Sequence, residues 1–153
     1  MKNIVILGAG TAGTIMLNKL HKKLDPNTWK ITIVDNAHTH YYQPGFLFIP
    51  FGVYTKKDVV KPKKDFFPEG SNIINSDIWK VLPEYSKVHL KNGQTLDYDF
   101  LVIATGAKTA PEETEGLKGE LWYKDIFDFY TIEGSIALAE KLKTWKGGTM
   151  VIN

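Results

Sequence analysis

Residues 4–13 read Ile-Val-Ile-Leu-Gly-Ala-Gly-Thr-Ala-Gly, and this stretch decides the fold. Its first four residues form a short apolar run rich in β-branched side chains, which is typical of a buried parallel strand. Residues Thr14–Leu24 then carry apolar side chains at helical spacing. A second apolar run, Trp29–Val34, ends at Asp35. Strand, helix and strand within about thirty-five residues predict a βαβ unit, and therefore an α/β fold with a parallel sheet.

The glycines between the first strand and the helix have G-x-G-x-x-G spacing, which predicts a binding site for a pyrophosphate. The first glycine permits a tight turn, the second leaves room for phosphate, and the third lets the helix pack closely on the strand. Phosphate would then lie at the helix N-terminus, where free N–H groups and the helix dipole favour negative charge. A purely structural glycine turn is the alternative. The expected pyrophosphate contacts are Gly8, Gly10, Thr11, Ala12 and Gly13.

Asp35 stands at the end of the second strand, about twenty residues after Gly13. A carboxylate in this place accepts hydrogen bonds from adenosine ribose hydroxyls and repels a 2′-phosphate. We therefore expect Asp35, with Asn36 beside it, to hold the ribose; the alternative is ordinary turn chemistry after a strand. NADP is disfavoured because all 19 basic side chains are lysines, so no arginine is available for the extra phosphate.

The remaining chain predicts a long irregular segment over residues 36–70, followed by a meander of short strands. An Asn-Gly hairpin signal at residues 92–93 supports the meander. Gly147 to Ile152 starts a new strand that has no partner element after it, so we expect the sequence to be a fragment cut at the start of a second nucleotide-binding domain. The other predicted elements are strands Asn72–Asn75, Ile78–Pro83, Lys87–Leu90 and Thr95–Tyr98, a buried strand Phe100–Ile103, and an amphipathic helix Thr131–Trp145.

After the meander, residues 99–106 read Asp-Phe-Leu-Val-Ile-Ala-Thr-Gly. With the glycine turn, the acid and the meander in this order, the whole chain resembles flavoproteins that have two dinucleotide-binding domains. The resemblance implies a Rossmann-type FAD-binding domain over residues 1–110, and a linker, helix and first strand of a truncated second domain over residues 111–153. It also implies that Ala104, Thr105 and Gly106 pass close to FAD.

Residues 41–52, Tyr-Tyr-Gln-Pro-Gly-Phe-Leu-Phe-Ile-Pro-Phe-Gly, resemble the segment that passes the isoalloxazine ring in three groups of enzymes. These are sulfide:quinone oxidoreductases, flavocytochrome c sulfide dehydrogenases and type II NADH dehydrogenases. The resemblance implies that Gln43, Pro44 and Gly45 lie at the ring and that Ile78 lies near the adenine. Ordinary aromatic packing is the alternative for the first segment.

The sequence of residues 41–52 is most similar to that of the sulfide:quinone oxidoreductases, which implies oxidation of sulfide and transfer of electrons through FAD to a quinone. A type II NADH dehydrogenase is the alternative, although Asn153 stands where that group would start a second glycine fingerprint. A non-catalytic nucleotide-binding redox module is the second alternative. The sulfide scheme needs redox cysteines; the chain has none, and Leu121–Lys124 occupies a stretch where some relatives carry one. No catalytic residue is assigned.

The composition of the chain limits the classes of partner that it is expected to bind. The formal net charge of +2 does not support nucleic-acid binding. The four histidines show no metal-binding spacing, so no metal is expected. A surface position is expected for His38 and His40, with a position near the flavin as the alternative. A lysine cluster at residues 56–64 indicates a solvated surface, with anionic lipid headgroups as the alternative. A cytoplasmic protein, or one on the cytoplasmic face of the membrane, is the expectation.

Overall fold

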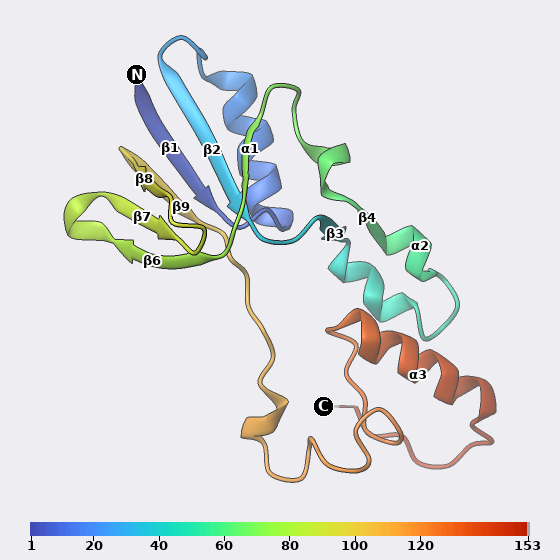
Figure 1. The fold of residues 1–153 in the computed structure, drawn as a ribbon. Coiled ribbons are helices and arrows are strands. Elements are labelled where there is room, and N and C mark those ends of the chain that lie inside the picture. The colour runs from blue at the N-terminus through green and yellow to red at the C-terminus, as the bar shows by residue number, and fades with distance from the viewer. Residues whose placement is uncertain (153) are drawn as a thin grey trace. The chain divides into compact units, whose positions relative to one another are not determined.

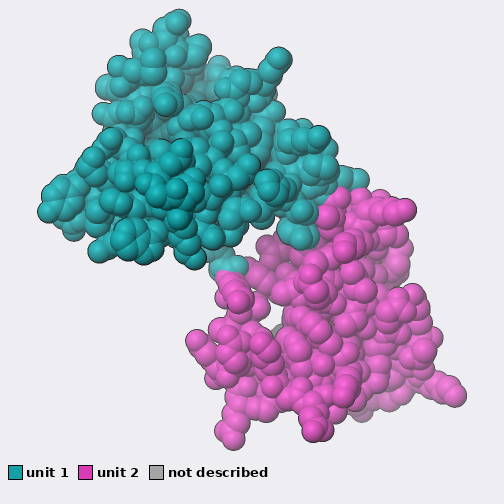
Figure 2. All heavy atoms as spheres, viewed as in Figure 1, with its two compact units in different colours: residues 1–41, 61–107 teal, residues 42–60, 108–153 magenta. Residues whose placement is uncertain are grey.

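The computed structural model describes residues 1–152 and divides the chain into two compact units. One unit comprises residues 1–41 and 61–107, and the other comprises residues 42–60 and 108–153 (Figure 2). Within the described residues, no helix is both long enough and apolar enough to cross a bilayer.

The chain begins with the predicted strand, helix and strand, and a series of short strands and a final helix follow later (Figure 1). The strands are β1 (Lys2–Leu7), β2 (Trp29–Asp35), β3 (Thr39–Tyr41), β4 (Val60–Pro62), β5 (Asn72–Asn75), β6 (Ile78–Leu82), β7 (Lys87–Leu90), β8 (Thr95–Asp97) and β9 (Phe100–Ile103). The α-helices are α1 (Thr11–Lys23), α2 (Lys56–Val59) and α3 (Ile132–Thr144), and the short 3-10 helices are η1 (Gln43–Phe48), η2 (Lys63–Phe66), η3 (Pro83–Tyr85) and η4 (Pro111–Glu113).

A parallel sheet with the order β5-β2-β1-β9 forms the centre of the first unit. The predicted meander is therefore only partly right. The strands β6, β7 and β8 do form an antiparallel sheet of three, but β5 pairs in parallel with β2 and belongs to the central sheet. A short strand that follows a long irregular segment can join either sheet, because its local sequence carries no information about its partner.

Both faces of the central sheet are covered, which explains why β1 and β2 are continuous apolar runs. Ile4 and Ile6 point to one face, where they pack with Leu17 of α1. Val5 and Leu7 point to the other face, where they pack with residues of the antiparallel sheet. Figure 1 shows α1 and the β6–β8 sheet on opposite sides of β1 and β2. This double layer fixes the carboxyl ends of the parallel strands, where the glycine turn lies.

The strand β9 is less buried than the sequence predicts. It is the edge strand of the central sheet, so its sole neighbour there is β1. Phe100 is 54% exposed and Ile103 is 67% exposed. An apolar run of four residues predicts a strand, but whether an apolar strand is central or at an edge depends on the topology.

The second unit has its own small core, in which Phe46, Ile49, Val59 and Ile132 are buried. Helix α3 begins after Thr131, whose hydroxyl accepts a hydrogen bond from the Gly134 N–H at 3.0 Å. The predicted strand over residues 147–152 is not formed in the described residues. A strand needs a hydrogen-bonded neighbouring strand, and residues 147–152 have none among the described residues. Asn153, which stands where a second glycine fingerprint would start, lies outside the described residues.

Candidate functional site

Two of the three fingerprint glycines are required by the packing of the turn itself. Gly8 has a φ of +93°, and a Cβ added to it would lie 2.4 Å from the Ala104 carbonyl oxygen. A Cβ added to Gly13 would lie 1.9 Å from the Gly8 carbonyl oxygen. Because such contacts are far inside van der Waals distance, neither position accepts a side chain without movement of the backbone. The predicted roles of these two glycines in the tight turn and the close packing are confirmed.

Gly10 differs from the other two. It is exposed, and a Cβ added to it would meet no atom within 4 Å. Its φ of −70° is also open to any residue. No steric contact within the protein therefore requires a glycine at this position, whereas a ligand phosphate lying against the backbone would.

The helix that follows the turn presents free N–H groups to this open space. Gly10 is the N-cap of α1, and the first helical hydrogen bond runs from the Thr14 N–H to the Gly10 carbonyl at 3.0 Å. The helical ladder therefore uses none of the N–H groups of Thr11, Ala12 and Gly13. The first turn holds no acidic residue, so the positive end of the helix dipole is not neutralised there. These features suit an anion.

Asp35 lies beside the glycine turn and is hydrogen-bonded to it. Its Oδ2 accepts the Ala9 N–H at 2.5 Å, and its Oδ1 accepts the Ala37 N–H at 2.8 Å. Lys63 Nζ lies 2.6 Å from Oδ1. Burial alone would raise the pKa of Asp35, but the Lys63 hydrogen bond, the two N–H donors and the Lys63 charge together outweigh it and hold the pKa below its ordinary value. Asp35 is therefore a carboxylate across the neutral range.

The residues predicted near the adenosine are also gathered here. The Asn36 side chain donates from Nδ2 to the Asp77 carboxylate at 2.6 Å, and the Ser76 N–H donates to the Asp35 carbonyl at 3.2 Å. Ile78, directly after Asp77, is half-buried and packs on the core cluster that contains Val34. Asn36 and the segment that leads to Ile78 therefore lie at the carboxyl end of β2, beside Asp35.

The Ala-Thr-Gly stretch, predicted to pass close to FAD, lies against the glycine turn. Ala104 donates its N–H to the Leu7 carbonyl at 2.7 Å, so the chain leaves β9 directly beside the end of β1. The added Cβ of Gly8 would meet both Ala104 and Thr105. Gly106 has a φ of +75° and open space around it.

The segment predicted at the isoalloxazine ring belongs to the other unit. Gln43 and Pro44 are exposed at the start of η1, whereas Gly45 is buried. A Cβ on Gly45 would lie 2.5 Å from Val59 Cγ1 and 2.8 Å from Tyr42 Cδ1. Packing within this unit therefore accounts for the glycine at position 45 by itself.

Two side chains near Asp35 were assigned to the surface by the sequence, and both assignments are wrong. Lys63 was predicted as part of an exposed cluster, yet its side chain is 9% exposed because it pairs with Asp35. His40 is half-buried and packs against Phe66, with ring centroids 4.5 Å apart and the rings tilted by 39°, and its Nδ1 has no hydrogen-bond partner among the described residues. Burial, and then the Lys63 charge, lower the pKa of His40, so the ring is neutral at pH 7. No local pattern distinguishes Lys63 from the lysines around it.

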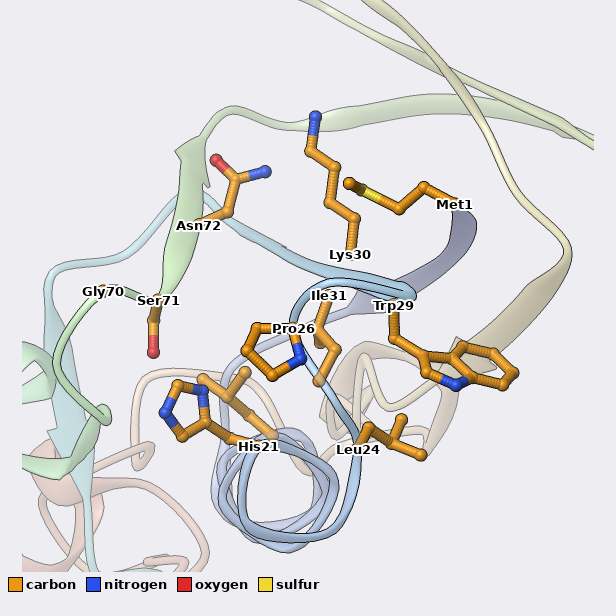
Figure 3. A pocket seen from close by; sticks show the side chains of 11 residues that line it. Met1, His21, Leu24, Pro26, Trp29, Lys30, Ile31, Gly70, Ser71 and Asn72 are labelled. Carbon is orange, nitrogen blue, oxygen red and sulfur yellow. The ribbon is translucent and has the colours of Figure 1, made fainter.

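A pocket of about 230 Å³ lies elsewhere in the first unit (Figure 3). It is lined by residues at the start of β1 and β2 and at the end of α1, including Met1, Leu24 and Trp29. This is the amino end of the parallel strands, whereas ligands of doubly wound sheets bind at the carboxyl end. The pocket is therefore distinct from the glycine turn. Within residues 1–152, no group of three or more acidic, histidine or cysteine residues could hold a metal ion.

The geometry fits one half of a dinucleotide. The open space over Gly10 and the free N–H groups suit a pyrophosphate, and the ionised Asp35 beside them suits a ribose hydroxyl. A family model described as pyridine nucleotide-disulphide oxidoreductase matches residues 2–144. The chain belongs to this family. Proteins of the family and the relatives given below are FAD-binding flavoproteins, so the predicted Rossmann-type fold and FAD are confirmed at the family level.

Two groups of relatives are similar to the chain. It is 32% identical over 149 residues to the mitochondrial sulfide:quinone oxidoreductase of Dictyostelium discoideum, covering 97% of the chain and 33% of the relative. It is 30% identical over 143 residues to the type II NADH:quinone oxidoreductase of Staphylococcus haemolyticus, covering 93% and 34%. The chain thus spans about a third of the length of these relatives.

Solved structures support the fold. The sulfide:quinone oxidoreductase of Aquifex aeolicus superposes with a TM-score of 0.70 at 24% identity, covering 94% of the chain and 32% of that structure. The NDH2 of Plasmodium falciparum in complex with NADH superposes with a TM-score of 0.63 at 21% identity, covering 90% and 28%. The predicted resemblance to both groups is confirmed, and an oxidoreductase family is established.

Proposed function

We propose that the chain supplies the binding site for the ADP half of FAD in an enzyme that oxidises sulfide and reduces a quinone. The observation that supports the cofactor role best is the open space over Gly10, which leaves room for a phosphate against the backbone. Pyrophosphate binds the N–H groups of Thr11, Ala12 and Gly13, and Asp35 accepts hydrogen bonds from the ribose. Asn36 and Ile78 border the adenosine, and Ala104, Thr105 and Gly106 complete the near wall of the site.

The remaining ring contacts follow from the resemblance of residues 41–52. Gln43 and Pro44 are exposed at the start of η1 and are assigned to the isoalloxazine region, with Gly45 behind them. FAD, when bound, supplies the electron-transfer chemistry, and the protein supplies binding, orientation and exclusion of water.

Sulfide as the electron donor is supported by the similarity to the Dictyostelium sulfide:quinone oxidoreductase, which extends over 97% of the chain. The chain has no cysteine, so any disulfide that sulfide attacks must come from outside residues 1–153. Quinones dissolve in the bilayer, so the proposal places the intact protein at the membrane surface, and it should sediment with membranes.

The competing donor is NADH, favoured by the similarity to the Staphylococcus haemolyticus enzyme. A steady-state assay of the purified intact gene product with a soluble ubiquinone analogue separates the two. Sulfide-dependent quinone reduction that is much faster than NADH-dependent reduction supports the proposal. The reverse order assigns the chain to the NADH group, and a flavin-containing protein that reduces quinone with neither donor points to a non-catalytic redox module.

A further inference from the structure

Lys63 is an unusual residue to find buried. Lysine is almost never buried unless its ammonium group is paired, because loss of hydration disfavours the charge. Here the side chain is 9% exposed and its Nζ lies 2.6 Å from Asp35 Oδ1. Its backbone is fixed as well, since the Lys63 N–H donates to the His38 carbonyl at 2.9 Å. The neighbouring Lys64, in the same 3-10 helix, is exposed.

The partner of Lys63 is the carboxylate to which the ribose is assigned. A carboxylate has about four lone-pair directions. In Asp35, one is used by the Ala9 N–H, one by the Ala37 N–H and one by Lys63. These three donors fix both oxygens relative to the glycine turn and leave one direction for a ribose hydroxyl. Lys63 is the only one of the three donors that carries a charge.

We propose that Lys63 is a positioning residue for FAD, which holds the Asp35 carboxylate charged and in the orientation that the adenosine ribose requires. This inference rests on the proposed role of Asp35. Lys63 acts through Asp35 and does not itself need to touch the cofactor.

The charges around Asp35 explain why Lys63 matters. The groups that face it are Lys63 from η2 and the backbone N–H groups of Ala9 and Ala37, with His40 of β3 beside Lys63. His40 is neutral at pH 7 and adds no positive charge. The carboxylate of Asp77 accepts a hydrogen bond from the side chain of Asn36, the residue after Asp35. Burial alone raises the pKa of Asp35, so without Lys63 the carboxyl group loses its main opposing influence.

The consequence is a pH dependence of cofactor binding. A protonated carboxyl group is a poorer acceptor for ribose hydroxyls, so FAD affinity falls as pH drops through the pKa of Asp35 in the free protein. With Lys63 present, that pKa lies below the ordinary value, and affinity stays constant down to about pH 5. In Lys63→Met the pKa of Asp35 rises, so we expect FAD affinity to be about tenfold lower at pH 7 and to begin its fall on acidification at a higher pH than in the wild type.

The test is a titration of the FAD-free intact gene product with FAD, followed by flavin fluorescence at pH 5 to 8. Lys64→Met is the matched control, because it removes the same charge from an exposed neighbour. Lys63→Gln keeps a hydrogen-bond donor without the charge; it should retain most of the affinity at pH 8 and lose it on the acid side. Thermal unfolding of each FAD-free variant reports whether the fold is intact.

Each outcome bears on one claim. If Asp35→Asn binds FAD as the wild type does, the proposed ribose site is wrong. If Asp35→Asn binds weakly while Lys63→Met and Lys63→Gln match Lys64→Met at every pH, the ribose site stands and the role of Lys63 is refuted. A pH-independent loss of affinity in both Lys63 variants, in proportion to a loss of stability, would show a purely structural role and also overturn the inference.

Discussion

Substitution by alanine should affect different properties at two glycines of the turn: folding stability at Gly13 and FAD affinity at Gly10. In Gly13→Ala, the new Cβ would lie 1.9 Å from the Gly8 carbonyl oxygen and 2.9 Å from its carbon, so α1 and the turn must separate by roughly 1 Å. Gly8 has little freedom to yield, because its N–H is bonded to the Val34 carbonyl at 2.8 Å and its Cα faces Ala104.

The expected cost follows from these contacts. Overpacking typically costs about 1–3 kcal/mol, and here the strained atoms are backbone on both sides, so the upper end applies. Alanine regains about 1 kcal/mol over glycine inside a helix. The net loss for Gly13→Ala is therefore about 2 kcal/mol or more. In Gly10→Ala the Cβ enters open space, so the free energy of unfolding should change by less than about 1 kcal/mol.

The affinity for FAD should instead be strongly reduced in Gly10→Ala, although its stability changes little. The methyl group of Gly10→Ala stands where the pyrophosphate must approach, and loss of two hydrogen bonds to a charged group, at about 1.5–3 kcal/mol each, weakens FAD binding by roughly 100-fold or more. Denaturant unfolding of the FAD-free intact protein and FAD titration of the same samples measure both quantities. A Gly10→Ala variant with wild-type FAD affinity would falsify the pyrophosphate assignment, and an unchanged stability of Gly13→Ala would refute the packing argument.

Three further predictions concern stability. The pKa of His40 is lowered in the folded state, so the unfolded chain binds more protons below about pH 6.5, and the free energy of unfolding should fall as pH drops from 7 to 5. In His40→Phe, denaturant unfolding at several pH values should show a smaller fall over this range. Thr131→Ala removes the N-cap of α3 and should cost about 1 kcal/mol in denaturant unfolding, whereas Thr144→Ala at the exposed end of the same helix should cost close to nothing; equal effects would contradict the capping role. Gly45→Ala places a Cβ 2.5 Å from Val59 Cγ1 and should lower the melting temperature; Val59→Ala in the same chain should restore part of that loss, and the absence of any coupling would show that the contact is not the cause.

The elements with strong local signals could be predicted from the sequence. The strand β1, the glycine turn, β2 and Asp35 lie where the pattern places them, since their signals span only a few residues each. Helix α1 begins at Thr11, three residues before the prediction, because the fingerprint itself supplies the first helical turn. The site residues around Gly8, Asp35 and Ala104 come together because parallel strands share one carboxyl edge.

What the sequence could not provide depends on long-range pairing. β5 joins the central sheet and β9 lies at its edge, and neither fact is encoded in the four residues of each strand. Lys63 pairs with a residue 28 positions earlier in the chain, so a lysine-rich segment conceals one buried lysine among exposed ones. The glycine at position 45 is explained by Val59, which only the folded second unit reveals.

The most direct test of the proposed function is an anaerobic visible-absorbance titration of the intact gene product, first with sulfide and then, on a fresh sample, with NADH. We expect about one equivalent of sulfide per flavin to bleach the flavin band and NADH to leave it largely unchanged. Bleaching by NADH alone would contradict sulfide as the donor, and a purified protein with no flavin band at all would contradict the cofactor site on which the account rests.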